Sequence, residues 1–119
     1  MDKRIAFLKK QMLSNLRHSP TIEKMARLVN LSESHLRQFF KREVGMSPVQ
    51  NLKDLRLEKA KKLLENTFLR VKEIQFETGI KDQSHFVKDF KKKYGLTPAE
   101  YRRQHQVEIG VEKSYTNKS

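Results

Sequence analysis

The 119-residue sequence contains no cysteine, only four glycines and three prolines, and no long hydrophobic run. Without cysteine, a disulfide framework, a thiolate metal site and a cysteine nucleophile are excluded. No apolar stretch approaches the roughly 20 residues that a membrane-spanning helix needs, and no secretory signal pattern opens the chain. We therefore expect a cytoplasmic location.

Basic residues are in large excess, because 26 Lys and Arg stand against 14 Asp and Glu and give a net charge of +12. Such an excess in a small domain attracts polyanions, either nucleic acid or an acidic membrane face. A solvated surface that keeps the protein soluble would also account for the charge. The distribution of the basic residues and the internal repeats must therefore decide between polyanion binding and a merely solvated surface.

The hydrophobic residues follow a helical period, and no stretch alternates apolar and polar residues as a strand does. The expected fold class is all-α with about seven helices. Helix-capping residues and glycines predict where these helices begin and end. The expected helices are Lys3–Leu16, Ile22–Val29 after Thr21, a third after Ser32 through Val44, Pro48 to about Glu65, Val71–Thr78, a sixth from Asp82 or Gln83 to Tyr94, and a last from Pro98 to near Gln104.

Two segments of the chain repeat each other. Residues 34–48 align with residues 84–98 at an offset of 50, and six of the fifteen pairs are identical. The short helices before them align at an offset of 49, so the second copy has one extra residue between its two helices. Each copy is a short helix, a tight turn and a longer helix with basic residues outside, which is the helix-turn-helix arrangement.

This repeat predicts the domain organisation. We expect a first helix-turn-helix subdomain over residues 1–46, a linking helix over 47–66, a second subdomain over 67–105 and a frayed tail over 106–119. The linking helix from Pro48 to Glu65 would be about 27 Å long. Successive major-groove segments on one face of B-DNA are about 34 Å apart, so this helix with its short joints suits two reading heads at that spacing.

At these residues the sequence resembles the DNA-binding domain of the AraC/XylS family of transcription regulators, from about Thr21 to Arg103. The second unit carries the strongest segment, and the first unit and the linking helix are similar too. The matching residues are Ile74, Gly79, Asp82, Gln83, Ser84, Phe86, Phe90, Lys91, Gly95 and Pro98, with Ala26, Leu31, Ser32, Leu36, Phe40, Lys41, Gly45, Met46, Ser47, Arg56, Leu57, Ala60, Leu63 and Leu64 before them.

Three positions depart from the family pattern. Gln75 stands where the family usually has alanine, Ile80 where it usually has phenylalanine, and Asn51 where an aromatic residue is usual. We expect these changes to loosen the packing of the second unit.

The outward faces of the two longer helices are the candidate base-reading surfaces. Arginine bonds guanine through a bidentate fork, glutamine does the same with adenine, and lysine donates to guanine. The resemblance implies Ser34, Arg37 and Gln38 as base-reading positions, with Arg37 the first choice for specificity. The candidate base contacts are Ser34, Arg37, Gln38, Gln83, Ser84, His85 and Lys88.

Phosphate contacts fix register without reading sequence, and basic helix ends and helix starts provide them. Cations at a helix C-terminus are also favourable without any DNA, so both interpretations of the lysine run at residues 91–93 stay open. Arg56 lies on the apolar side of the linking helix, so we expect a buried ion pair with a glutamate in preference to a DNA contact. The candidate phosphate contacts are Ser32, Lys41, Arg42, Lys91, Lys92 and Thr97.

An enzyme is not expected. The four histidines show no metal-ligand spacing, and no phosphate-binding glycine loop is present, so no cofactor or metal is predicted. The repeated Ser-His pairs do not form a nucleophile and base, because adjacent helical residues point about 100° apart.

The sequence therefore predicts a bacterial transcription regulator that reads two adjacent major-groove segments of double-stranded DNA. Such a regulator would activate or repress transcription, and activation would involve contact with RNA polymerase as a further partner. The chain is either a small regulator or, as we favour, a domain of a longer protein with a sensory or dimerisation domain. The alternative function is a basic module that binds proteins or acidic surfaces without reading sequence.

Overall fold

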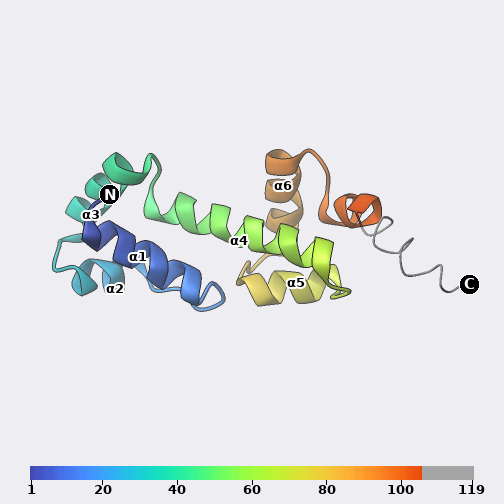
Figure 1. Ribbon diagram of the computed structural model, residues 1–119, viewed down its shortest axis with the longest axis horizontal. Helices are drawn as coiled ribbons and strands as arrows, with labels where there is room; N and C mark the ends of the chain where they lie inside the picture. Colours follow the sequence, from blue (N-terminus) through green and yellow to red (C-terminus); the bar gives the residue numbers. More distant parts are fainter. Residues whose placement is uncertain (106–119) are drawn as a thin grey trace, which may run out of the picture. The chain divides into compact units, whose positions relative to one another are not determined.

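The computed structural model describes residues 1–105 and shows helices and no strand among them (Figure 1). A further helical segment covers residues 98–105. The prediction of an all-α fold with about seven helices is confirmed, whereas the expected tail over 106–119 lies outside the described residues. The labelled helices are α1 (Lys3–Ser14), α2 (Ile22–Leu28), α3 (Glu33–Val44), α4 (Pro48–Asn66), α5 (Val71–Thr78) and α6 (Gln83–Tyr94).

The described helices include none that is both long and apolar enough to cross a membrane.

The chain divides into two units, Met1–Arg56 and Leu57–Ser119, and the boundary lies inside α4. Helices α1, α2 and α3 form the core of the first unit, against which the first half of α4 packs. The second unit is built by the later half of α4, α5, α6 and Tyr101 of the last helical segment. Each unit thus has its own small core.

The third and sixth helices begin and end as their sequences predict. The Ser32 hydroxyl accepts a hydrogen bond from the His35 N–H (3.1 Å) at the start of α3. Asp82 does the same for the Ser84 N–H (2.8 Å) at the start of α6. Gly45 and Gly95 end these helices in the left-handed conformation, with φ of 92° and 86°. These caps satisfy backbone groups that a helix end leaves without partners.

Helix α1 is shorter than expected, because it ends at Ser14 and not at Leu16. The Leu16 side chain is still buried at 4% exposure, as the apolar pattern predicts. Its carbonyl accepts hydrogen bonds from the Arg56 side chain (2.9 and 3.1 Å). The side chain of a distant arginine therefore satisfies a carbonyl that lies just beyond the helix.

Asn51 belongs to the first unit and not the second. It is 7% exposed, and its side-chain amide donates to the Met12 sulfur (3.3 Å). The expectation that this departure from the family pattern loosens the second unit is therefore wrong for Asn51. The Asn51 amide stands where the family usually has an aromatic ring, and its nitrogen is paired with Met12. The departure therefore affects packing in the first core and not in the second.

Gly45 offers a direct test of the helix end. A Cβ built there meets no atom within 4 Å, so the cost of adding one comes from the backbone conformation alone. We expect Gly45→Ala to lower the free energy of unfolding by about 1 kcal/mol. Gly45→Asn should cost less, because asparagine tolerates positive φ. Urea unfolding followed by circular dichroism measures both; equal losses would contradict this explanation.

Candidate nucleic-acid interface

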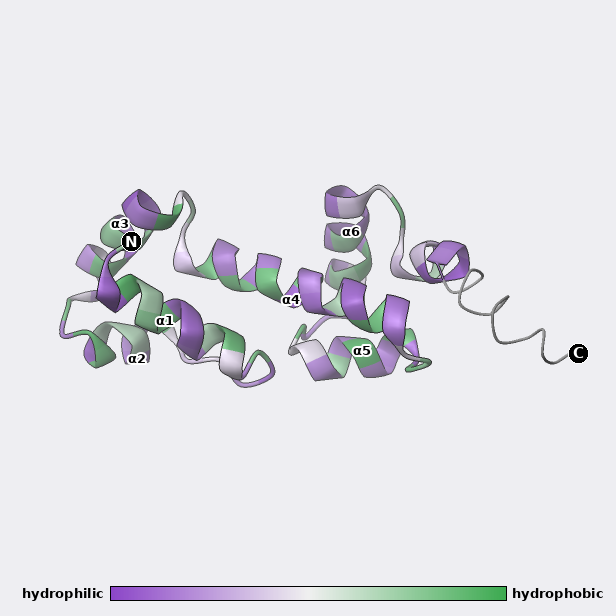
Figure 2. Ribbon diagram, viewed as in Figure 1, coloured by the Kyte–Doolittle hydropathy of each residue, from purple (hydrophilic) through white to green (hydrophobic). Residues whose placement is uncertain are grey.

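Helix α3 presents a polar face to solvent because its apolar side packs in the first core. Leu36 and Phe40 are fully buried. Ser34, Arg37 and Gln38, the predicted base contacts of this helix, are all exposed. Figure 2 shows that α3 carries both hydrophilic and hydrophobic residues.

Helix α6 repeats this arrangement in the second unit. Phe86 and Phe90 are fully buried, and their rings meet edge to face with centroids 5.9 Å apart. The other side is exposed at all four predicted base contacts. These are Gln83, Ser84, His85 and Lys88. Each unit therefore offers one polar helix face, and base contact by these residues stays a prediction.

Two of these side chains have acidic neighbours. The Arg37 Nη2 lies 3.4 Å from Glu33 Oε1, one turn away on an exposed face. The His85 Nδ1 lies 3.7 Å from Asp82 Oδ2. Exposed pairs of this kind contribute little to stability, so Arg37 can leave Glu33 at low cost.

The predicted phosphate contacts differ in what they have left to donate. Lys41, Arg42, Lys91 and Lys92 are exposed, as is Ser32, whose hydroxyl keeps its own hydrogen for donation. The four cationic side chains lie in the last turns of α3 and α6, the two helices with the predicted base contacts, which we call the reading helices.

Thr97 is the least suited of the predicted phosphate contacts. Its backbone N–H donates to Glu100 Oε1 (2.9 Å), and its hydroxyl accepts from the Glu100 N–H (3.2 Å). Hydrogen bonding by the Thr97 backbone N–H, and then by its side chain, lowers the pKa of the Glu100 carboxyl, which is therefore ionised at this helix start. The backbone and the side chain of Thr97 thus both bond Glu100, and a phosphate there would meet a negative charge.

Lys93 differs from the other cations of the lysine run. Its Nζ lies 3.8 Å from Glu58 Oε2 and 5.6 Å from the centre of the Tyr94 ring. The last lysine of the run is thus turned toward α4, within its own unit.

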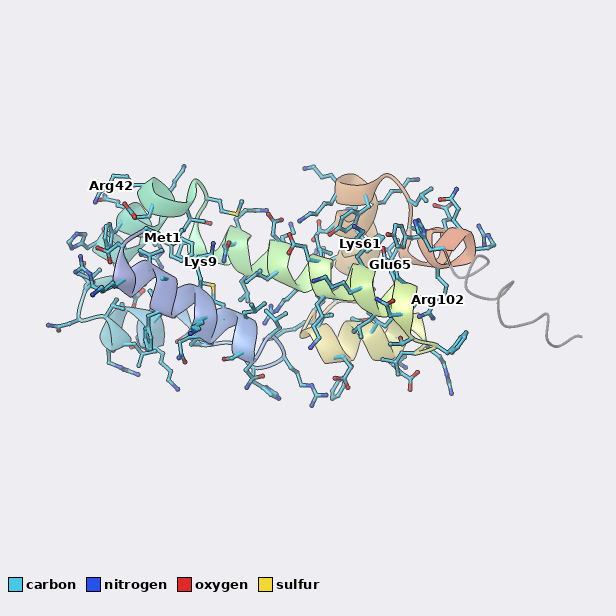
Figure 3. The ribbon with its side chains drawn as sticks, viewed as in Figure 1. Met1, Lys9, Arg42, Lys61, Glu65 and Arg102 are labelled. Carbon is cyan, nitrogen blue, oxygen red and sulfur yellow. The ribbon has the colours of Figure 1, made fainter. Side chains whose placement is uncertain are left out.

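Sequence reasoning missed an aromatic support for two arginines. The guanidinium carbons of Arg4 and Arg42 lie 4.9 and 5.2 Å from the centre of the Phe39 ring. Figure 3 shows Arg42 on α3. Arg42 follows Phe39 by three residues, so helical spacing could have revealed that pair. Arg4 lies on α1, and no local signal connects it with Phe39.

The prediction that Arg56 forms an ion pair with a glutamate is wrong. Arg56 donates to the Leu16 carbonyl and to the Ser19 hydroxyl (3.0 Å). Partial burial lowers the pKa of its guanidinium. The Leu16 carbonyl and the Ser19 hydroxyl thus accept the hydrogen bonds of Arg56. The apolar spacing placed Arg56 on the packed side of its helix but could not identify these acceptors.

Within residues 1–105, no group of three or more histidine, cysteine or acidic side chains is placed to hold a metal ion.

Comparison with known proteins gives the family. The model of a family described as "Helix-turn-helix domain" matches residues 25–104. A solved structure of a probable AraC family transcriptional regulator from Rhodopseudomonas palustris is similar with a TM-score of 0.80 and 25% identity, covering 87% of this chain and 98% of that one. The chain belongs to the AraC/XylS helix-turn-helix family.

Curated relatives of this AraC/XylS domain are longer proteins. It is 33% identical over 103 residues to the HTH-type transcriptional regulator MtrA of Neisseria gonorrhoeae, covering 87% of this chain. It is 33% identical over 94 residues to the lactose operon transcription activator of Staphylococcus xylosus, covering 79% of this chain. The chain spans 34% of the length of each. Because family and relatives are regulators, the prediction that the chain is not an enzyme is confirmed.

The cap of α6 can be tested without DNA. Asp82 accepts from the backbone N–H groups of Ser84 and His85. We expect Asp82→Ala to destabilise the second unit by about 1 kcal/mol, and Asp82→Asn to keep most of that stability, because asparagine caps as well as aspartate. Thermal unfolding measures both variants, and an alanine variant as stable as the wild type would refute the cap.

Proposed function

We propose that this AraC/XylS domain binds double-stranded DNA sequence-specifically and regulates transcription. One observation supports this most directly. Each unit contains a helix with buried phenylalanines on one side and exposed hydrogen-bonding side chains on the other, preceded by a short helix that contacts it. In helix-turn-helix proteins, a helix of this kind enters the major groove.

The exposed side chains have the chemistry to read base edges. The guanidinium of Arg37 suits the O6 and N7 of guanine, and the amide of Gln38 suits the N6 and N7 of adenine. In the second unit, Lys88 donates to guanine. Ser34, Gln83, Ser84 and His85 complete the proposed base contacts.

Phosphate contacts would set the register of each reading helix. The proposed donors are Ser32, Lys41, Arg42, Lys91 and Lys92, with Thr97 a weaker one because it bonds Glu100. The cation–π contact of Arg42 with the Phe39 ring restricts its guanidinium, so less conformational entropy is lost when it binds a phosphate.

We propose that the two units contact two major-groove segments within one asymmetric site of about 20 base pairs, two helical turns. Helix α4 contributes to both units and has 19 residues, or about 28 Å of helix. Duplication inside the chain would then supply what a dimer provides in other helix-turn-helix proteins.

The wider role of the protein is also part of the proposal. One relative is a transcription activator, which supports activation through contact with RNA polymerase. The matched segment covers only 34% of each of these relatives, which supports a sensory or dimerisation domain in the intact protein. A regulator that binds DNA acts where the DNA lies, so the proposed site of action is the cytoplasm of a bacterium.

The first test is a gel-shift series on a duplex selected from a random pool, with every base pair substituted in turn. We expect Arg37→Ala to lose preference at one position of the site, with a cost of about 1–3 kcal/mol on the preferred base. Lys88→Ala should act at another position. A uniform loss on every duplex would instead assign Arg37 to a phosphate.

The second test uses neighbouring lysines of α6 as a matched pair. We expect Lys92→Ala to weaken binding equally on all sequences and to reduce the salt slope by about 1. Lys93→Ala should change the slope less, because its Nζ already lies near Glu58. Equal slopes for wild type and Lys92→Ala would remove Lys92 from the contacts.

A salt titration separates this function from its rival, a basic module that does not read sequence. Binding of both weakens as salt rises, but only a sequence reader keeps a large preference for one duplex. Membership in the AraC/XylS family favours sequence-specific DNA binding over the basic module.

A further inference from the structure

The duplication extends beyond the helix-turn-helix pairs. In the first unit, α1 buries Ile5, Leu8 and Met12, and in the second, α4 buries Leu57, Ala60 and Leu64. The two sets share an offset of 52 residues. Each unit therefore consists of a leading helix, a helix-turn-helix pair and a following helix, and α4 is the following helix of the first unit and the leading helix of the second.

In each unit, an arginine on the following helix bonds the connection that leads into the helix-turn-helix pair. Arg56 of α4 donates through Nε and Nη2 to the Leu16 carbonyl and through Nη2 to the Ser19 hydroxyl. Ser19 lies two residues before Thr21, the cap of α2. The bonds join residues 37 and 40 positions apart in the chain.

Arg102 makes the corresponding bonds in the second unit. Its Nη1 donates to the Leu69 carbonyl, and its Nη2 donates to the Thr67 carbonyl (3.2 Å). Leu69 directly precedes Arg70, the residue before α5. Arg102 is half-buried, and burial lowers the pKa of its guanidinium. Figure 3 shows it beside the end of α4.

The two arginines do not occupy equivalent positions of the repeat. Arg102 follows Pro98 by four residues, whereas Arg56 follows the equivalent Pro48 by eight. Leu52 stands at the position equivalent to Arg102 and packs against the first core. The connections also differ, with seven residues at 15–21 and four at 67–70. Arg102 therefore makes its bonds from one turn nearer the start of its helix than Arg56 does. This accompanies the shorter connection of the second unit.

We propose that Arg56 and Arg102 are positioning residues for DNA reading, each fixing the short helix that supports the reading helix of its own unit. Helix α2 contacts α3, and α5 contacts α6. The guanidinium bonds add to the burial of Leu16 in the first connection and to the packing of Leu69 against the core in the second. A planar guanidinium with two or more bonds to it restricts that loop, which lysine with its single ammonium cannot do equally well.

This inference rests on the proposed function, and its consequence is specific. Each unit contacts one of the two major-groove segments of the DNA site, here called its half-site. Loss of one arginine loosens one unit, so base discrimination should fall at the half-site of that unit and not at the other. A role in overall stability alone would reduce binding to both half-sites and to unrelated duplexes together.

The test measures base discrimination at each half-site by gel shift, with Arg37→Ala marking the half-site of the first unit and Lys88→Ala that of the second. We expect Arg56→Met to lower discrimination about tenfold at the first half-site only, and Arg102→Met at the second only, since hydrogen bonds from a charged group are among the strongest. Affinity for an unrelated duplex should change less than about twofold, because phosphate contacts dominate it. Arg56→Lys and Arg102→Lys should recover part of the loss.

One further variant gives a result even where the first does not fold. Ser19→Ala removes one acceptor and leaves Arg56 in place, so a smaller loss at the first half-site is expected even if Arg56→Met does not fold. Equal losses at both half-sites, or none in a folded Arg56→Met protein with Ser19→Ala also unchanged, would overturn the positioning role. If Arg37→Ala and Lys88→Ala alter no position in the site, the proposed function itself fails.

Discussion

Burial of the phenylalanines on the two reading helices is the interaction on which the rest of the structure depends. Phe40 in α3 and Phe90 in α6 are fully buried, and burying such a side chain contributes about 1.5–3 kcal/mol. With one side of the helix held in a core, the opposite side must face solvent. The polar faces that include Arg37 and Lys88 are therefore a consequence of core packing in each unit, and not of interactions among the polar residues themselves.

Much of the fold could be predicted because its signals are local. Serine and aspartate caps at Ser32 and Asp82, and the glycines that end α3 and α6, act within one helical turn. The buried stripes repeat at helical spacing, so the exposed faces followed from the same pattern. The internal repeat joins each short helix and the longer helix after it into one motif, so the sequence alone identifies the candidate surfaces.

The contacts that the sequence did not reveal join residues far apart in the chain. Arg4 and Phe39, Arg56 and Leu16, and Arg102 and Leu69 are each separated by more than 30 positions. An arginine on an apolar face signals a buried donor, but many acceptors are compatible with that signal. Backbone carbonyls carry no sequence signature at all, so the glutamate predicted for Arg56 was a reasonable partner of the wrong kind.

The central claim is that two similar units read two neighbouring segments of one DNA site. Hydroxyl-radical footprinting of the chain on its preferred duplex tests this most directly. The account predicts two protected segments about 10 base pairs apart, on the same face of the helix. One protected segment alone, or two segments about half a turn out of phase, would contradict it.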